Sequence, residues 1–370
     1  MNPKKVIFSD NTLWGLLNFR GTVIRHFIKK GYEVVIMAPE DEVSEMKAIA
    51  PSDLKFISVK MERTTSNPFK DLSYLFRVIK IYHKEKPDYV FHYTIKPNIY
   101  GSIAARINGI KSSVMIAGLG YVFENKNLVS YIARMLYKIG LSCSNNVFLL
   151  NEENKKKVIN RKLCSPEKIT LLSGGEGVDL NLFKKYENDS EIVTFLFIGR
   201  ILYDKGYKEF VKCAELAKKE FSNVEFEVWG TLDVTYPNAV SDEQLKKDCQ
   251  KEVIKYKGFI VDMNEALKRK GLVVMLPSYY GEGLNRSLME ACATGKPIIT
   301  TNIAGCRETV IDGENGFIVS PKNVDELLNA VRRYMNMSTG ERSEMSKRSR
   351  QLAEERFNVN DVEKIYDKLI

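Results

Sequence analysis

Apolar residues along the first part of the chain alternate between short unbroken runs and runs with helical spacing. The unbroken runs, rich in Val, Ile and Phe, predict strands buried on both faces, which is typical of a parallel sheet covered by helices. In the segment 72–86, by contrast, Leu72, Leu75, Phe76 and Ile79 recur at the spacing of one helix face. These patterns predict strands at residues 4–10, 32–41, 88–94, 112–118 and 145–151, and helices at 16–31, 72–86, 98–109 and 128–140.

The apolar pattern stops over residues 184–192, a polar stretch that we interpret as a linker, and a second strand–helix series follows it. A chain of 370 residues exceeds the usual size of a single core, so two domains are expected. We predict an α/β fold of two Rossmann-like, doubly wound parallel sheets, in residues 1–183 and 193–355, that face each other across a ligand-binding cleft. Residues 356–370 are expected to form a C-terminal helix that could return to the first domain. The second series predicts strands at 193–200, 224–230, 257–261, 272–278, 297–301 and 316–321, with helices at 208–221, 242–256, 264–271 and 325–336 and a further helix opening near 283 and ending near Gly295.

The net charge of +9 comes entirely from the first part of the chain. Residues 1–150 hold 21 Lys and Arg against 12 Asp and Glu, whereas residues 151–370 hold 35 of each. A basic N-terminal domain indicates an anionic partner, such as a membrane surface, a pyrophosphate-bearing lipid or a nucleic acid, although a solvated surface without a partner explains the charge equally well. No nucleic-acid recognition motif supports the last of these partners.

The six cysteines are dispersed without a C-x-x-C pair, and only three histidines accompany them, so the sequence predicts neither a zinc site nor a disulfide framework. The N-terminal apolar run is too short for a signal peptide, and no uncharged apolar stretch reaches the length of a membrane span. We therefore expect a cytoplasmic protein that contacts an anionic membrane surface peripherally, through its basic N-terminal domain.

The stretch GEGLNRSLME places Glu282 and Glu290 eight residues apart, at the start of a helix that follows the apolar run LVVMLPS. Eight helical residues turn the chain about 80° beyond two full turns, so the two acids share one broad side of the helix. A carboxylate accepts two hydroxyl groups at once, which suits a sugar, and the free N–H groups of residues 283–286 would bind an anion. A surface acid and a solvated helix residue are the plainer explanation of the same spacing.

A second candidate feature lies at the end of the first strand of the second domain, where Arg200 and Lys205 flank a turn. Two cations at a strand end would neutralise a diphosphate, Arg200 by two parallel hydrogen bonds and Lys205 as a point charge. A surface ion pair with Asp204 is the alternative. No Asp-x-Asp sequence occurs, which argues against a transferase that holds its diphosphate through a metal ion.

With these motifs in order, the sequence resembles the retaining glycosyltransferases of family four, which have the GT-B fold. The resemblance rests on Glu282 to Glu290 as an E-x7-E arrangement, together with IGR…DKG, KGFIVD, TNIAGCRE and DGENGFIV. The segments FHYTIKPNIYGSIAARI and AGLGYVFE are similar to the bacterial subgroup that extends polysaccharide or lipid-linked oligosaccharide repeats, as in capsule, O-antigen or exopolysaccharide. The resemblance covers nearly the whole chain and is most specific in the second domain.

The resemblance implies a metal-independent enzyme without a cofactor that takes a hexose or N-acetylhexosamine from a nucleotide diphosphate sugar, most simply a UDP-sugar, to a lipid-linked saccharide. Arg200 and Lys205 would bind the donor diphosphate, Glu282 the hydroxyls of the sugar and Glu290 those of the ribose. The backbone of Gly283, Leu284, Asn285 and Arg286 would support sugar and phosphate, and Gly258, Phe259 and Ile260 would flank the base.

The acceptor side is less clear from the sequence. Asn11 and Arg20 follow the first strand, Thr94 and Lys96 follow the fourth, and we predict that they contact the acceptor together with the backbone of Gly118 and Gly120. Many family members carry a histidine where this chain has Ala117-Gly118-Leu119-Gly120. His92 is the nearest strand-end substitute, although a lone histidine there is more often structural. Relatives in the subgroup often have proline where this chain has Asn285, a change expected to matter little.

Three other functions share parts of this pattern. A sugar-nucleotide epimerase of the same fold would need acid and base groups, and the scarcity of histidine counts against it. A two-lobed sugar-binding protein would have tandem α/β domains but is normally exported. A nucleic-acid binder would account for the charge but not for the paired glutamates.

Overall fold

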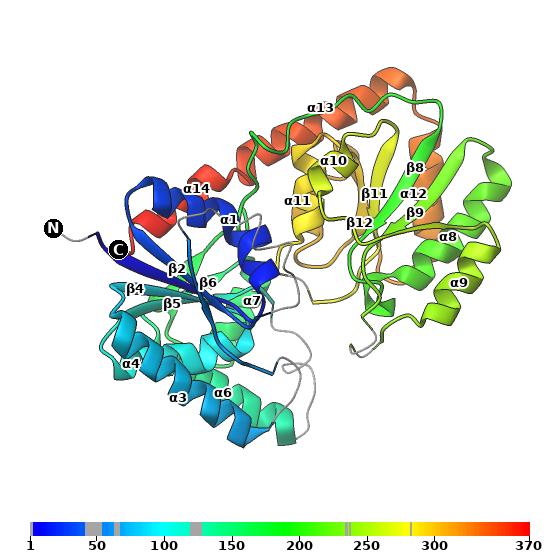
Figure 1. Cartoon of the computed structure of the whole chain (residues 1–370). Helices are drawn as coiled ribbons and strands as arrows, with labels where there is room; N and C mark the ends of the chain where they lie inside the picture. The colour runs from blue at the N-terminus through cyan, green and yellow to red at the C-terminus, as the bar shows by residue number, and fades with distance from the viewer. Residues whose placement is uncertain are drawn as a thin grey trace. The chain divides into compact units, whose positions relative to one another are not determined.

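A computed structural model of the chain describes residues 3–40, 54–62, 67–118, 128–233, 236, 238–281 and 283–370. The chain divides into two compact units (Figure 1). Unit 1 contains residues 1–176 and 359–370, and unit 2 contains residues 177–358. Residues 184–192, which the sequence predicts as the linker, contain no helix or strand and lie within unit 2. The predicted domain limits stay a prediction.

Unit 1 is built on a seven-stranded sheet whose neighbouring strands all pair in parallel, in the order β3-β2-β1-β4-β5-β6-β7. Helices α3, α4 and α6 cover one face of the sheet, and α1 and α14 cover the other (Figure 1). The strands are β1 (Lys5–Ser9), β2 (Glu33–Ala38), β3 (Lys55–Ser58), β4 (Tyr89–Tyr93), β5 (Lys111–Ile116), β6 (Asn146–Leu149) and β7 (Ile169–Leu171). The helices are α1 (Leu13–Lys29), α3 (Pro68–Glu85), the π-helix η1 (Pro97–Gly101), α4 (Ser102–Ile107), α6 (Leu128–Cys143), α7 (Glu152–Asn160), the 3-10 helix η2 (Pro166–Lys168) and α14 (Val359–Asp367).

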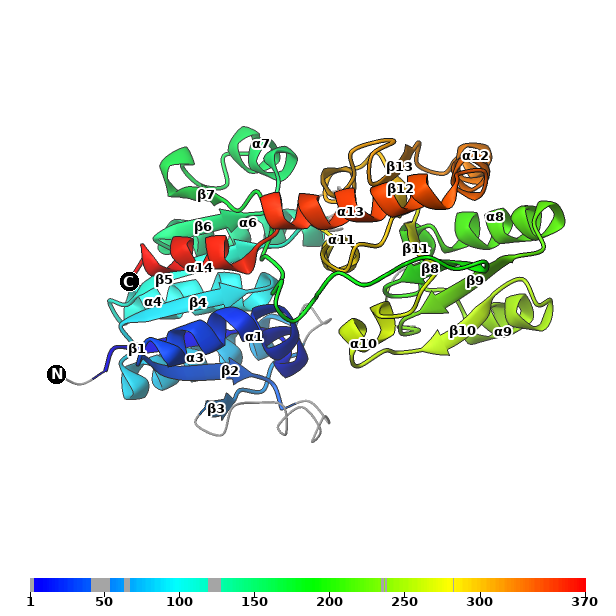
Figure 2. The ribbon, with the colours of Figure 1, turned by 90° about the horizontal axis from the view of Figure 1, so that it is seen from above.

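Unit 2 is built on a six-stranded parallel sheet in the order β10-β9-β8-β11-β12-β13. Helices α8 and α12 pack against each other, as do α11 and α13 (Figure 2). The strands are β8 (Val193–Ile198), β9 (Val224–Trp229), β10 (Lys255–Gly258), β11 (Leu272–Leu276), β12 (Ile298–Thr301) and β13 (Gly316–Val319). The helices are η3 (Tyr203–Lys205), α8 (Tyr207–Glu220), α9 (Asp242–Gln250), α10 (Met263–Leu267), α11 (Arg286–Ala293), η4 (Arg307–Thr309), α12 (Val324–Met335) and α13 (Thr339–Arg356).

The central strands are buried along their whole length, as their unbroken apolar runs predict. Every residue of β8 and of β11 is buried. In unit 1, β1 lies between β2 and β4 in the sheet. Its residue Val6 pairs with Val34 of β2 and with Tyr89 of β4. Because both faces of such a strand contact helices, burial of β-branched and aromatic side chains on both sides stabilises the sheet.

Three element predictions need correction. The helix expected over residues 242–256 ends at Gln250, because Glu252 adopts a left-handed conformation (φ 57°) that no helix continues through. The strand expected over 257–261 is β10, which pairs with β9 from Lys255 and ends at Gly258. The helix expected over 98–109 begins as the π-helix η1 before it becomes α4.

Candidate active site

Glycines end three neighbouring strands of unit 2, so backbone rather than side chains forms this part of the sheet edge. Gly199 follows β8, Gly230 follows β9 and Gly258 closes β10, all with positive φ. The Gly230 N–H donates to the Gly258 carbonyl at 2.8 Å. A Cβ on Gly230 would lie 1.7 Å from the Gly199 carbonyl oxygen, so no other residue fits there. A Cβ on Gly199 or Gly258 would meet nothing within 4 Å, so at these two glycines a ligand can approach the backbone closely.

Two aromatic rings contact the two predicted diphosphate-binding cations. Arg200 follows Gly199 directly, and Lys205 closes η3 and is 7% exposed. The Arg200 Cζ atom lies 3.8 Å from the centroid of the Tyr236 ring and 6.0 Å from that of Tyr280. The Lys205 Nζ atom lies 5.3 Å from the Tyr280 centroid. Because Tyr280 attracts both cations, it holds two positive groups on one small area, an arrangement suited to an anion with two charges.

A glycine joins this cation pair to the loop after β11. Gly206 is left-handed (φ 83°), and a Cβ there would lie 2.2 Å from the Pro277 carbonyl oxygen. The Tyr279 N–H donates to the Asp204 carbonyl at 2.8 Å. The loops that follow β8 and β11 are thus in direct contact, and this contact sets the position of Tyr280 relative to Lys205.

Helix α11 begins later than the sequence predicts, at Arg286, with Asn285 as its N-cap. The Asn285 side chain accepts from the Leu288 N–H at 3.2 Å, and the Asn285 N–H itself donates to the Gly305 carbonyl at 2.8 Å. The sequence led us to expect that this N–H would be free to bind an anion. In the structure it is instead engaged within the protein. A proline at this position would lose both bonds, so asparagine here is not the neutral change that we predicted. The contributions of Gly283 and Leu284 stay predictions.

Glu290 lies on α11 and is 6% exposed. Its Oε1 atom accepts from the Arg286 Nε atom at 2.7 Å, and the Arg286 guanidinium also donates to the Gly177 carbonyl. Burial raises the pKa of the Glu290 carboxyl above its usual range, although the Arg286 charge opposes the shift. Glu282, its predicted partner, lies outside the described residues.

The predicted base-binding segment begins where β10 ends. Gly258 is left-handed (φ 75°), its carbonyl is bound by Gly230, and the Phe259 side chain that follows is 47% exposed. An exposed aromatic ring next to a strand-end glycine offers a surface on which a planar base can stack. The roles of Phe259 and Ile260 remain predictions.

In unit 1, Arg20 is buried among groups of the fold. Its guanidinium donates to Glu176 Oε1 at 2.7 Å and lies 3.6 Å from Asp10 Oδ2. It also stacks over the Tyr93 ring, with Cζ 4.4 Å from the centroid. The side chain predicted to contact the acceptor therefore joins the end of β1 to Glu176, the residue at which the chain leaves unit 1.

The loop after β4 has unusual backbone geometry. Thr94 is left-handed (φ 68°), which is rare for a β-branched residue, and η1 begins three residues later. Strained residues and π-helical turns are enriched at functional sites. Lys96 in the same loop pairs with Asp71 on α3 at 2.5 Å. This loop is where the structure gives most support to an acceptor site.

The remaining predictions on unit 1 have mixed outcomes. The Asn11 N–H donates to Asp10 Oδ1 at 2.6 Å, and the Asn11 side chain is partly exposed. Gly118 closes the described segment after β5, whereas Gly120 lies outside the described residues. His92 is fully buried and bonded to the Tyr82 hydroxyl at 2.9 Å, and burial lowers its pKa to about 3. A neutral, buried His92 has a structural role. This is the interpretation that the sequence favoured for a lone histidine at a strand end.

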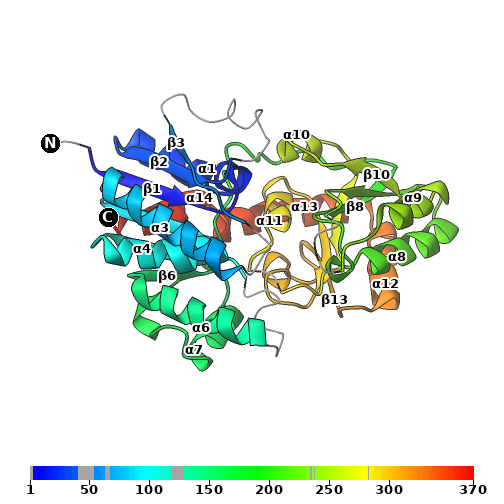
Figure 3. The same cartoon turned by 60° about the horizontal axis from the view of Figure 1, so that its bottom comes forward.

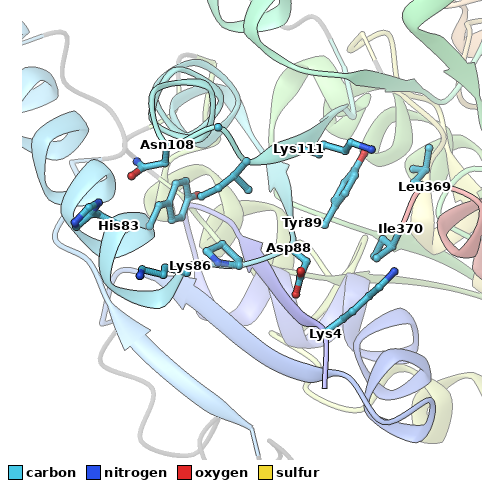
Figure 4. A pocket seen from close by; sticks show the side chains of 13 residues that line it. Lys4, His83, Lys86, Asp88, Tyr89, Asn108, Lys111, Leu369 and Ile370 are labelled. Carbon is cyan, nitrogen blue, oxygen red and sulfur yellow. The ribbon is translucent and has the colours of Figure 1, made fainter. Parts of the chain in front are cut away.

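A pocket of about 620 Å³ lies at the opposite, amino edge of the unit 1 sheet, near the starts of β1, β4 and β5 (Figure 4). Lys4, Lys86, Asp88 and Lys111 lie on its rim, and their side chains point in different directions rather than toward one point. It contains none of the predicted site residues, which follow the strands at the carboxyl edge. Among the described residues, no group of three or more His, Cys, Asp or Glu side chains could hold a metal ion.

Comparison with known proteins decides the family. Residues 179–352 match the family described as glycosyl transferases group 1, and residues 5–151 match the glycosyl transferase 4-like family. The chain is a group 1 glycosyltransferase of family four. The predicted donor residues of this glycosyltransferase fall within the first of these matches and the predicted acceptor residues within the second.

Two curated relatives match most of the glycosyltransferase. The capsular polysaccharide biosynthesis glycosyltransferase CapM of Staphylococcus aureus is 27% identical over 72% of each chain. The N,N'-diacetylbacillosaminyl-diphospho-undecaprenol alpha-1,3-N-acetylgalactosaminyltransferase of Campylobacter jejuni is 27% identical over 84% of each chain. Among solved structures, Anabaena HepE in complex with UDP and glucose superposes with a TM-score of 0.76 at 16% identity, over 99% of this chain and 98% of that one. That similarity shows the GT-B fold.

Sequence reasoning missed the aromatic residues of the site. Tyr280 lies between the segments LVVMLPS and GEGLNRSLME, but nothing in its spacing separates it from Tyr279, whose ring lies 4.4 Å from the Lys322 Nζ atom instead. Tyr236 is 36 positions from the Arg200 it covers, so only the fold brings them together. The Arg286–Glu290 pair, in contrast, has the four-residue spacing of a helical ion pair and could have been predicted.

Proposed function

We propose that this glycosyltransferase transfers a hexose or N-acetylhexosamine, with retention of configuration, from a UDP-sugar to a lipid-linked saccharide. The observation that carries the proposal is the pair of cations, Arg200 and Lys205, gathered around Tyr280 at the end of β8. The pathway would be the synthesis of a bacterial surface polysaccharide, because the Staphylococcus aureus relative is a capsular polysaccharide glycosyltransferase and the Campylobacter jejuni relative acts on a diphospho-undecaprenol-linked sugar. Unit 2 would bind the donor and unit 1 the acceptor, at the cytoplasmic side of the membrane that carries it.

The proposed chemistry breaks the bond between the anomeric carbon and the diphosphate oxygen and forms a bond from that carbon to the acceptor oxygen. The acceptor hydroxyl gives its proton to the departing phosphate oxygen on the same face of the sugar, so no protein base is needed. Negative charge grows on the leaving diphosphate in the transition state. Preorganised cations stabilise that charge more than they stabilise the bound donor, so Arg200 and Lys205 would act mainly on kcat.

The two glutamates would have different tasks. Glu290, buried and bonded to Arg286, would accept the ribose hydroxyls and so set nucleotide affinity. Glu282 would accept hydroxyls of the transferred sugar and so affect donor selectivity and rate. The backbone near Gly283 and the exposed Phe259 ring would complete the donor site beside sugar and base.

Turnover with labelled UDP-hexoses and UDP-N-acetylhexosamines tests the proposal, using a short polyprenyl-diphosphate-linked saccharide as acceptor. We expect transfer from at least one donor and a product whose new linkage keeps the donor's anomeric configuration. Inversion would rule out the proposed mechanism. Conversion of the UDP-sugar to an epimer without transfer would favour the epimerase alternative.

A further inference from the structure

The side chain of Arg286, the first residue of α11, donates to two acceptors at once. Its Nε atom donates to Glu290 Oε1 at 2.7 Å, one helical turn further along, and its Nη1 atom donates to the Gly177 carbonyl. The guanidinium group is planar and its N–H groups point in fixed directions, so these two bonds set its orientation. The family resemblance implies a role for the backbone of Arg286 and none for this side chain.

The buried Glu290 carboxylate is held through one of its two oxygens. Oε1 accepts from Arg286, whereas Oε2 takes no hydrogen bond from the described part of the chain. A carboxylate that is fixed at one oxygen has a defined direction, and its second oxygen can accept from a ligand. The bond to Arg286 therefore decides how Glu290 is presented.

The same bond affects whether Glu290 is ionised. Burial raises the pKa of the Glu290 carboxyl, and the Arg286 charge lowers it. Among the described residues, the charged side chains on elements that pack against α11, such as Arg307 and Glu308 of η4 and Arg350 of α13, do not contribute to the shift. Loss of the Arg286 cation would therefore raise the pKa further and protonate the carboxyl at a higher pH.

The second acceptor, the Gly177 carbonyl, belongs to a segment that is fixed within unit 2. Gly177 is left-handed (φ 70°), and the Val178 N–H that follows donates to the Phe357 carbonyl at 2.6 Å. Further along, the Phe183 carbonyl accepts from Arg350 Nη1 at 2.7 Å. Because this segment is held at several points, its carbonyl can keep the guanidinium of α11 in place.

Helix α11 packs against α13, on which Arg350 makes a similar bridge (Figure 3). Arg350 Nε donates to Glu354 Oε1 at 2.6 Å, four residues further along, and Nη1 donates to the carbonyls of Phe183 and Ala293. The Glu354 side chain, however, is 52% exposed. The two arginines thus differ in the carboxylate that they hold, which is buried on α11 and exposed on α13.

We infer that Arg286 is a positioning residue for nucleotide recognition, which holds the Glu290 carboxylate so that the protein selects ribose over deoxyribose. This inference rests on the proposed function, in which Glu290 accepts the ribose hydroxyls. Arg286 does not touch the ribose and acts through Glu290. An ionised, fixed carboxylate accepts charge-assisted hydrogen bonds from hydroxyls, whereas a nucleotide without these hydroxyls leaves the buried carboxylate unpaired.

Calorimetric titration of the full chain with UDP and with 2′,3′-dideoxy-UDP, which lacks both ribose hydroxyls, tests the inference. We expect the wild type to prefer UDP about tenfold or more, because hydrogen bonds to a charged group are among the stronger ones. Arg286→Leu should reduce the preference to about twofold or less, because the carboxylate is no longer fixed and ionised. Arg350→Leu is the matched control and should lower the stability of unit 2 without changing the preference.

A pH series gives a second readout that a purely structural role of Arg286 would not move. Wild-type affinity for UDP should fall as the pH drops through the raised pKa of Glu290. Arg286→Leu should shift this fall to higher pH, since the cation that stabilises the carboxylate is gone. Arg286→Lys keeps the charge but not the forked geometry, so it should keep the wild-type profile and recover part of the preference.

The outcomes separate this inference from the proposed function. A wild type that binds neither nucleotide would contradict the donor site itself. Equal wild-type affinity for both nucleotides, or a preference and pH profile that Arg286→Leu leaves unchanged, would overturn the inference alone. An equal loss of preference in Arg350→Leu would also overturn it, because the effect would then belong to the fold. Circular dichroism establishes that each variant is folded, and if the leucine variant is not, Arg286→Lys with an unchanged full preference contradicts the inference.

Discussion

The carboxyl edges of the two sheets belong to the same kind of fold but use their residues in opposite ways. In unit 2 the strands end on glycines, and Arg200 and Lys205 gather around Tyr280. In unit 1 the comparable cation, Arg20, is buried in contact with Asp10 and Glu176. The unit 2 cations thus lie where the proposed diphosphate site requires them, whereas Arg20 in unit 1 binds acidic groups of the scaffold. The same architecture supports both uses because residues outside the sheets, Arg200 and Lys205 after β8 and Arg20 on α1, carry the difference.

The largest effect is expected at Arg20. Arg20→Ala leaves the carboxylates of Glu176 and Asp10 buried without their cation, so it should lower the free energy of unfolding of unit 1 by about 3–5 kcal/mol. Urea unfolding followed by circular dichroism measures this loss. Arg25→Ala, at an exposed position on the same helix, should change stability by less than about 0.5 kcal/mol. Equal stability of Arg20→Ala and wild type would show that Arg20 is free for the acceptor after all.

Arg200→Ala and Lys205→Ala should each lower kcat about 10²-fold or more, because each removes a preorganised positive charge that would stabilise the leaving diphosphate. Steady-state kinetics with a UDP-sugar and a lipid-linked acceptor gives the values. Lys322→Ala removes a cation that also lies over a tyrosine ring, that of Tyr279, and should leave kcat within about twofold. Near-normal turnover in both site variants would end the assignment of the diphosphate site.

Gly206→Ala keeps both cations but should shift the loop that carries Lys205, so it tests whether the position of the cations matters. The added Cβ would lie 2.2 Å from the Pro277 carbonyl oxygen, and the left-handed backbone disfavours alanine, so unit 2 should lose more than about 1 kcal/mol of stability. Donor affinity should fall as well, because the loop after β8 must move with Lys205 on it. Calorimetric titration with UDP, beside thermal unfolding, checks both. An unchanged affinity would mean that this contact does not position the site.

The smallest effect concerns pH. Burial raises the pKa of Glu290, so its carboxylate takes up a proton at a higher pH than an exposed glutamate does. If the ionised form accepts the ribose hydroxyls, affinity for UDP-glucose should be constant above the raised pKa and should fall as the pH drops through it. Titrations over a pH series measure the profile. Glu290→Gln should bind more weakly and lose this dependence, and a variant that retains the profile would contradict the role of Glu290.

Candidate donor residues could be proposed from the sequence because they are close together along the chain. Arg200 and Lys205 lie within one turn, and Glu290 lies in the segment that opens with Glu282. Parallel pairing of the strands also followed from unbroken apolar runs such as β8 and β11. Spacing could not reveal contacts with distant parts of the chain, such as the Tyr236 ring over Arg200. Nor could it reveal that the Asn285 N–H, predicted to be free, donates to the Gly305 carbonyl.

The acceptor side was harder for a physical reason. A helix cation such as Arg20 of α1 looks the same in sequence whether it points at solvent or into the fold, and only tertiary contacts decide. Likewise, the apolar residues of α6 are equally compatible in sequence with a helix buried on both sides and with one that has an exposed apolar face. Exposure of Tyr131 and Met135 becomes visible only once the helix layer is in place.

Calorimetric titration of the chain with UDP, GDP and dTDP tests the central claim most directly, in the wild type and in a variant carrying Arg200→Ala and Lys205→Ala together. We predict that the wild type binds UDP and that the double variant binds it at least about tenfold more weakly, because charge-assisted contacts to the diphosphate are lost. Binding of none of the three nucleotides by the wild type, or equal affinity in the double variant, would contradict the account.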